Sequence, residues 1–261
     1  MNTTNANAKL GFDKFEECNY NLHWSFSNFN RILITANQIA SLKKGAKVLE
    51  LCCGSSNLST LVKRNFNRYD IDFYKVDGDE KYKNSDEIFV YDILSKEFDS
   101  FCKDYGPFDC VVFMEAIEHF KPDLFELSNN KFNSNLIAKI NNMLVYEGML
   151  IVTAPTPPFN GIFENRVWPL DHETEPTQDS LYNTINEWFK INKSIGWSLE
   201  ERDYNTILEE DDFLRRVYIK LSKAYPDAYV KAIIASLAPD IANRQILYIC
   251  KKRRARNGRP S

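Results

Sequence analysis

The chain has 261 residues, of which 44% are hydrophobic and 13% aromatic, so it can bury the core of one large domain. Its formal net charge of −3 excludes a protein whose whole surface attracts nucleic acid or an anionic membrane. The six cysteines show no paired Cys-x-x-Cys spacing, which argues against a zinc site or a disulfide framework and favours reduced thiols in a cytoplasmic protein. Neither a signal peptide nor an apolar run that could cross a bilayer is recognisable, so we expect no membrane partner.

The N-terminal part of the chain divides into two segments. Residues 1–10 are rich in Asn and Thr and are predicted to be disordered. Residues 11–45 are predicted to form a cap or lid, with many aromatic side chains before residue 30 and a helix over 32–42. Two interpretations of this cap stay open, namely a lid over a cofactor site and ordinary core packing.

From residue 46 to residue 250, short apolar strands alternate with amphipathic helices. This alternation predicts an α/β domain with a doubly wound, mostly parallel sheet of seven strands. A helical insertion is expected at about 203–244, and residues 251–261 form a basic tail. The predicted strands are 47–51, 72–76, 88–91, 108–113, 149–153, 197–202 and 245–250, and the predicted helices are 58–66, 96–103, 134–144, 183–195 and 208–237.

Acidic side chains close the first three predicted strands, at Glu50, Asp77 and Asp92. The first strand then enters a turn of small residues that contains Gly54 and opens a helix. Such a turn presents backbone N–H groups at the edge where open α/β sheets bind nucleotide-like ligands, and carboxylates there can accept hydrogen bonds from ribose hydroxyls or an adenine amino group. One acid alone would be ordinary solvation, whereas three in succession favour a site for an adenosine.

The turn after the first strand also carries a family resemblance. Residues 47–59, KVLELCCGSSNLS, resemble the first motif of class I S-adenosylmethionine (AdoMet) methyltransferases, which usually reads acid-x-Gly-x-Gly-x-Gly. Only Gly54 of the three glycines is kept, and Cys52 and Ser56 stand in place of the outer two. The resemblance implies a Rossmann-like methyltransferase fold that binds AdoMet and releases S-adenosylhomocysteine.

A second segment strengthens this resemblance. Residues 108–122, FDCVVFMEAIEHFKP, resemble the fourth motif of ubiquinone-biosynthesis-type O-methyltransferases, and 144–157 resemble the turn and fifth strand that follow it. In this family Asp77 would bind the ribose, and Asp92 with Ile93 the adenine. Glu50 would order the first loop near the amino-acid end of the cofactor. The resemblance thus implies cofactor contacts from Glu50, Cys52, Gly54, Ser55, Asp77, Gly78, Asp92, Ile93, Met114 and Glu115.

Glu115, Glu118 and His119 form the most reactive-looking cluster, because the spacing i, i+3, i+4 predicts that they share one helix face. With the downstream His172, they also resemble the metal ligands of small-RNA 3′-terminal 2′-O-methyltransferases. Three interpretations stay open. In the first, His119, His172 and Glu118 are catalytic, and one histidine takes the proton from a hydroxyl. In the second, Mg²⁺ or Mn²⁺ binds to Glu115, Glu118, His119 and His172. In the third, the acids only complement the dipole at a helix N-terminus.

These patterns together predict an AdoMet-dependent methyltransferase that acts on a hydroxyl of a small-molecule acceptor. Two alternatives stay open, an RNA 3′-terminal 2′-O-methyltransferase with a divalent metal and a non-catalytic AdoMet-binding relative. Three roles of the helical insertion stay open: it caps the acceptor, it forms the face of a homodimer, or it simply packs against the sheet. The basic tail is expected either to contact RNA or to be an ordinary solvated terminus.

Overall fold

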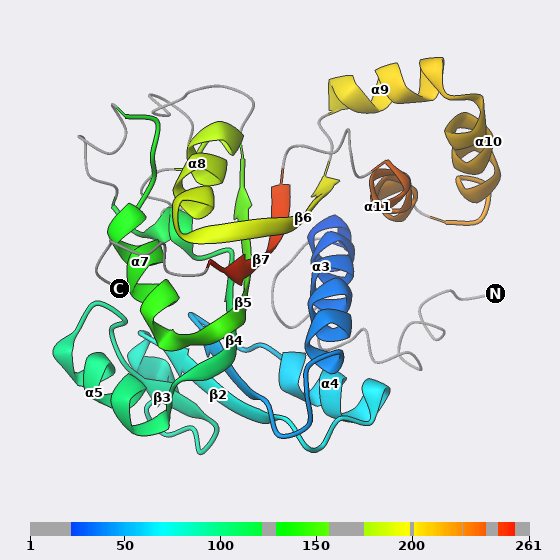
Figure 1. Cartoon of the computed structure of the whole chain (residues 1–261). Coiled ribbons are helices and arrows are strands. Elements are labelled where there is room, and N and C mark those ends of the chain that lie inside the picture. The colour runs from blue at the N-terminus through cyan, green and yellow to red at the C-terminus, as the bar shows by residue number, and fades with distance from the viewer. Residues whose placement is uncertain are drawn as a thin grey trace.

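The computed structural model describes residues 22–121, 129–156, 175–198, 201–225, 227–238 and 245–253. Its centre is a seven-stranded sheet with the order β3-β2-β1-β4-β5-β7-β6, in which only the two pairs made by β7 are antiparallel (Figure 1). This confirms the predicted doubly wound, mostly parallel α/β sheet. The strands are β1 (Lys47–Leu51), β2 (Asp72–Asp77), β3 (Ile88–Val90), β4 (Phe108–Met114), β5 (Leu144–Pro155), β6 (Phe189–Ser198) and β7 (Gln245–Lys252).

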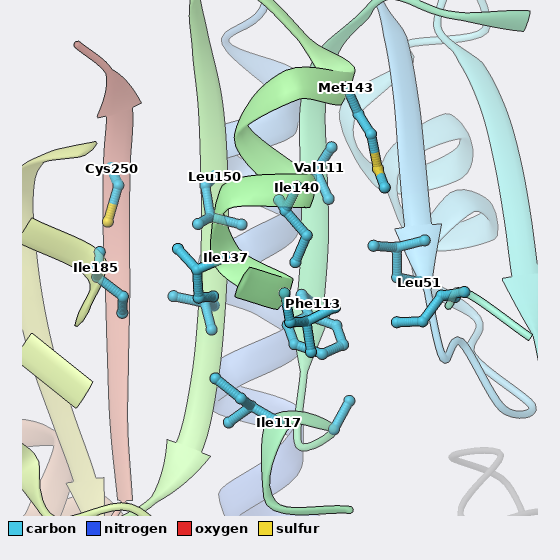
Figure 2. Close-up of a cluster of buried hydrophobic side chains, with 14 of the residues drawn as sticks. Leu51, Val111, Phe113, Ile117, Ile137, Ile140, Met143, Leu150, Ile185 and Cys250 are labelled. Carbon is cyan, nitrogen blue, oxygen red and sulfur yellow. The ribbon is translucent and has the colours of Figure 1, made fainter. Parts of the chain in front are cut away.

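Helices cover both faces of the sheet, which explains why the central strands are apolar on both sides. One face packs against α3 (Leu22–Ala40) and α4 (Leu58–Phe66), and the other packs against α5 (Lys96–Tyr105), α7 (Ser134–Met143) and α8 (Gln178–Trp188). Successive residues of β4 alternate between the two cores, as a strand requires. Figure 2 shows the second core, where side chains of α7 meet those of β4 and β5.

Many element bounds agree with the predicted ones within one or two residues. The exceptions are β5, which begins at Leu144 and not at 149, α3, which begins at Leu22 and not at 32, and the region from 178 to 202. The predicted helix 183–195 and strand 197–202 are wrong, because α8 ends at Trp188 and β6 runs from Phe189 to Ser198. The side chain of Thr177 caps α8 by accepting a hydrogen bond from the Ser180 N–H at 3.1 Å. From Phe189 onward the chain pairs with β7 as an antiparallel strand, with irregularities in the register after Ile191 and after Gly196.

Two short 3₁₀ turns lie in the connections that follow β2 and β4. The turn η1 (Glu80–Tyr82) lies in the short connection between β2 and β3. The turn η2 (Ile117–His119) follows β4, where the sequence predicted the start of a helix. The Asn133 side chain donates hydrogen bonds to the Ile117 and Phe120 carbonyls and thereby fixes the backbone of η2.

The predicted helical insertion consists of α9 (Glu201–Glu210), α10 (Asp212–Leu221) and α11 (Asp227–Leu237). These helices share a small core of their own, and α11 lies beside α3 and β6 (Figure 1). No helix in the described ranges is long and apolar enough to span a bilayer. The expected disorder of 1–10 and the basic tail beyond Arg253 lie outside the described residues, and the division of the chain at 45/46 and 250/251 stays a prediction.

Candidate functional site

The candidate site lies where the strand order of the sheet reverses. The chain proceeds from β1 outward to β2 and β3 on one side, and β4 and β5 lie on the other side of β1. At such a switch point the connections leaving two neighbouring strands diverge, and they leave a crevice at the carboxyl ends of the strands. The structure places the acids that close β1, β2 and β4 at this end of the sheet.

The turn after β1 is held in a left-handed backbone conformation. Cys52 has φ 50° and Gly54 has φ 52°, a region that favours glycine. The Cys53 N–H donates to the Val76 carbonyl at 3.1 Å, and the Gly54 N–H donates to Asp77 Oδ2 at 2.7 Å. A Cβ on Gly54 would meet only the Tyr82 hydroxyl at 3.9 Å, so conformation rather than lack of space requires glycine here.

Asp77 braces this turn from the end of β2. Its Oδ1 also accepts the Asp79 N–H at 2.9 Å, so each carboxylate oxygen keeps capacity for one further donor. Asp92 lies at the end of the neighbouring strand, exposed, with Oδ1 accepting the Leu94 N–H at 2.9 Å. The other predicted contacts on this side are Ser55 and Gly78, which are exposed, and Ile93, which is buried.

The Cys52 thiol, in the turn after β1, has a raised pKa. Burial and the carboxylates of Asp77, Glu118 and Asp92 together raise its pKa to about 12. These three acids come from the end of β2, the η2 turn and the end of β3. With that pKa the thiol stays protonated at neutral pH and is not a nucleophile.

Glu50 is buried directly beneath the turn, with only 2% of its surface exposed. Burial raises the pKa of its carboxyl to about 7, although a hydrogen bond from Ser56 and the charges of Lys75 and Arg31 act in the opposite direction. Its Oε2 has no hydrogen-bond partner. A buried acceptor of this kind is a place where a ligand's donor can bind.

Two cations that were not among the predicted site residues, Lys75 and Arg31, lie close to these acids. Lys75 lies in register with Glu50 on β2, and its ammonium donates to the Ser56 carbonyl at 3.2 Å and to Glu87 at 3.3 Å. Arg31 comes from α3 and forms an ion pair with Glu115 at 3.1 Å. The signal in the sequence is a single charged residue within an otherwise apolar strand or helix face, because only a partner makes burying such a charge tolerable.

Glu115 ends β4 in a left-handed conformation, with φ 48°. Its backbone N–H donates to the Thr153 carbonyl, and its Oε1 accepts the Thr153 hydroxyl at 2.9 Å. The preceding Met114 is half-buried, with the Thr35 hydroxyl 3.5 Å from its sulfur. These contacts anchor the end of β4 to both β5 and α3.

Glu118 is almost fully buried in η2, with 1% exposure, and its Oε2 has no hydrogen-bond partner. Burial and then the neighbouring Glu115 carboxylate raise the pKa of Glu118 well above its ordinary value. His119, by contrast, is exposed. The prediction that Glu115, Glu118 and His119 share one helix face is therefore wrong, because a left-handed residue and a 3₁₀ turn replace the helix.

The remaining predicted residue, His172, lies outside the described residues. Within the described ranges, no three His, Cys, Asp or Glu side chains gather closely enough to hold a metal ion. The predicted site for Mg²⁺ or Mn²⁺ at Glu115, Glu118, His119 and His172 thus gains no support from the structure.

The residues at the switch point fit AdoMet. The buried atoms Arg31 Nε, Glu50 Oε2 and Glu118 Oε2 lack hydrogen-bond partners, and each such atom costs about 1–3 kcal/mol while it stays unsatisfied. A ligand that carries both an ammonium and a carboxylate supplies a donor to Glu50 and an acceptor to the guanidinium. The methionine part of AdoMet has these two groups, and its adenosine offers hydroxyls and an amino group to Asp77 and Asp92.

Comparison with known proteins yields matches among solved structures alone. No protein-family model and no curated protein matches the chain. A SAM dependent methyltransferase from Archaeoglobus fulgidus shares 18% identity over 85% of this chain and 94% of its own, with a TM-score of 0.50. The fold is that of the Rossmann-like methyltransferases.

Two further structures are similar to this chain at lower TM-scores. The N-methyltransferase NodS from Bradyrhizobium japonicum WM9, in complex with S-adenosyl-L-homocysteine, shares 11% identity over 88% of each chain, with a TM-score of 0.49. The [4+2]-cyclase SpnF shares 16% identity over 84% of this chain and 79% of its own, with a TM-score of 0.47. Their TM-scores lie below 0.5, so neither structure carries an argument about this chain.

Proposed function

We propose that the chain is an AdoMet-dependent methyltransferase that methylates a hydroxyl group of a small molecule. The main support is the set of buried, unsatisfied charged atoms of Arg31, Glu50 and Glu118 at the switch point of the sheet. They lie at the end of the sheet where the left-handed Gly54 turn presents its backbone, which is where folds of this kind bind nucleotides.

Each part of the donor would meet a different group of side chains. Asp77 and Asp92 would accept hydrogen bonds from the ribose hydroxyls and the adenine amino group. Glu50 would face the ammonium of the methionine part, and Arg31 would face its carboxylate. When bound, AdoMet supplies a methyl group on a sulfonium, which is already electrophilic, so the protein needs mainly to align the acceptor and exclude water.

A hydroxyl acceptor must also lose a proton, and Glu118 is the side chain that we assign to take it. Its carboxyl is buried and its pKa is raised, so it binds a proton more strongly than an exposed glutamate does. His119 points to the exposed side of η2 and is the weaker candidate of the two.

The charge at the strand ends favours a small acceptor over RNA. Among the described residues at the strand ends, the acids Glu50, Asp77, Asp92, Glu115 and Glu118 outnumber the cations Arg31 and Lys75, although burial favours the neutral forms of Glu50 and Glu118. A polyanion would be repelled there, because RNA binding depends on cations that neutralise phosphates. An uncharged or cationic small molecule meets no such barrier.

The test is methyl transfer from isotope-labelled AdoMet into the small-molecule fraction of a cell extract, read by mass spectrometry. We expect at least one species to gain one methyl group. Glu118→Gln should lower the rate by a factor of about 10²–10⁴ while S-adenosylhomocysteine still binds. His119→Ala should leave the rate close to that of the unaltered protein.

Two results would contradict this proposal in different ways. Binding of S-adenosylhomocysteine without transfer to any small molecule or RNA would show a non-catalytic AdoMet-binding protein. Loss of transfer in His119→Ala together with normal transfer in Glu118→Gln would leave the enzyme class intact and move the proton-accepting role to the histidine.

A further inference from the structure

A basic cavity lies at the opposite end of the sheet from the candidate site. It has a volume of about 470 Å³ and is lined by Glu147, Lys190, Asn192, Lys251, Lys252 and Arg253. Glu147 stands near the start of β5, whereas Thr153, which contacts Glu115, stands near its end. Six residues of extended strand separate them by about 20 Å, so the two sites are distinct.

The charges in this cavity are unbalanced. Four of the six lining side chains are cationic, and one is acidic. Lys190 and Lys251 are exposed and stand directly opposite each other on the antiparallel pair β6–β7. Like charges directly opposite each other on neighbouring strands destabilise the sheet.

The other two cations are fixed by the backbone of the protein. The Lys252 ammonium donates to the Asn141 carbonyl at 2.8 Å and to the Leu144 carbonyl at 3.0 Å, where α7 passes into β5. Arg253 donates to the Phe189 carbonyl and to the Asn186 side chain. Carbonyl partners leave both positive charges uncompensated, so the local field stays positive.

Protection of the sheet edge explains only part of this arrangement. Lysines on an edge strand discourage pairing with another chain, and β6 is the edge strand of this sheet. Lys251 and Lys252, however, lie on β7, which is paired on both sides by β5 and β6. The bonds of Lys252 to carbonyls at the C-terminal end of α7 give that cation a structural role, so it is the charge of Lys251 that neither edge protection nor helix capping explains.

We infer that this cavity binds the phosphate group of a small phosphorylated molecule. Lys190 and Lys251 would contact the phosphate oxygens from opposite strands, with the fixed charges of Lys252 and Arg253 adding to the attraction and the Asn192 amide offering a further donor. The volume is that of a cavity for a small ligand. This inference does not depend on the proposed methyltransferase activity, because the cavity is remote from the candidate site at the carboxyl ends of β1, β2 and β4.

The test is calorimetric titration of the whole chain with inorganic pyrophosphate at about 50 mM and about 200 mM salt. We expect binding of one pyrophosphate that weakens as the salt rises. Lys190→Ala and Lys251→Ala should each weaken it about tenfold, since each removes one charge-assisted contact. Lys193→Ala is the matched control, because it removes the same charge from β6 outside the cavity and should leave the affinity unchanged.

Thermal unfolding provides an independent readout that also shows that the variants fold. Without pyrophosphate, Lys190→Ala and Lys251→Ala should unfold at the same or a higher temperature than the unaltered chain, because each removes the like-charge pair. Added pyrophosphate should raise the unfolding temperature of the unaltered chain and of Lys193→Ala, but not that of the two cavity variants.

Three results would overturn the inference. The first is no binding of pyrophosphate at the lower salt concentration. The second is an equal loss of affinity in Lys193→Ala, which would show a diffuse attraction to the whole surface. The third is a short single-stranded RNA that displaces pyrophosphate and binds far more tightly through Lys190 and Lys251, which would make the phosphate source a polymer.

Discussion

Glu50 shows how one buried side chain links stability to the candidate site. Its carboxyl has an ordinary pKa of 4.5 and a pKa of about 7 in the folded chain, because burial penalises the charged form. The unfolded state therefore releases this proton at lower pH than the folded state does. A charge kept in this environment is costly for folding but available to a cationic ligand.

The stability of the chain should reflect this difference. As the pH rises from about 4.5 to about 7, the Glu50 contribution to the free energy of unfolding falls by about 3 kcal/mol, and it is constant above that range. Urea unfolding should show that Glu50→Gln gains stability relative to the unaltered chain over this interval. The exposed Glu80→Gln should show no such gain, and a pH-independent difference for Glu50→Gln would contradict the burial of the charge.

The sequence predicts those site residues whose position follows from local sequence. It does not predict those that reach the site only through tertiary contacts. Gly54 and Asp77 follow their strands directly, so the strand pattern was enough to select them. Arg31 and Lys75 can be recognised as site residues only from the structure, because α3 and β2 bring them close to Glu115 and Glu50. The exposure of His119 depends on the left-handed backbone at Glu115, which no spacing rule indicates.

At the scale of elements, α3 connects the N-terminal segment with the end of β4. The Arg31–Glu115 ion pair links them, together with the contact of the Thr35 hydroxyl with the Met114 sulfur, and both charged side chains are largely buried. Replacing one partner leaves the other charge buried without compensation, which typically costs about 3–5 kcal/mol, whereas removing both charges together can be nearly neutral.

A double-mutant cycle tests this link. Arg31→Met should lower the free energy of unfolding by several kcal/mol, and Arg31→Met combined with Glu115→Gln should recover part of that loss, with a coupling energy of about 1–3 kcal/mol. Arg64→Met, on the exposed side of α4, is the matched control and should change little. Strictly additive effects of the two substitutions would show that the pair does not hold α3 to the strand.

Element prediction succeeded where local signals agree with the tertiary structure. The bounds of β1 and α4 follow from an apolar run, a small-residue turn and an amphipathic helix, and they match the sequence prediction. The region around Trp188 failed because aromatic and aliphatic residues continue from α8 into β6 without a glycine or proline between them. Pairing with β7 determines where α8 ends and β6 begins, and this long-range pairing cannot be recognised from the local sequence.

At the scale of the molecule, two regions of opposite charge lie at opposite ends of the sheet among the described residues. Acids and unsatisfied buried atoms gather at the carboxyl ends of β1, β2 and β4, and cations gather at the far end of β6 and β7. The sequence predicted the first region through three strand-ending acids. It indicated only a basic tail for the second, because Lys190 comes beside Lys251 through the antiparallel register of β6 and β7.

The central claim is that AdoMet binds across the strand ends beside Gly54, and titration calorimetry with S-adenosylhomocysteine tests it most directly. The chain should bind one molecule with a dissociation constant on the order of micromolar. Gly54→Val should abolish this binding, because a β-branched residue strains the left-handed turn. Gly45→Val is the matched control, since Gly45 has φ 70° and open space around it but lies away from the site. Failure of the unaltered chain to bind S-adenosylhomocysteine, or full affinity in Gly54→Val, would contradict the account.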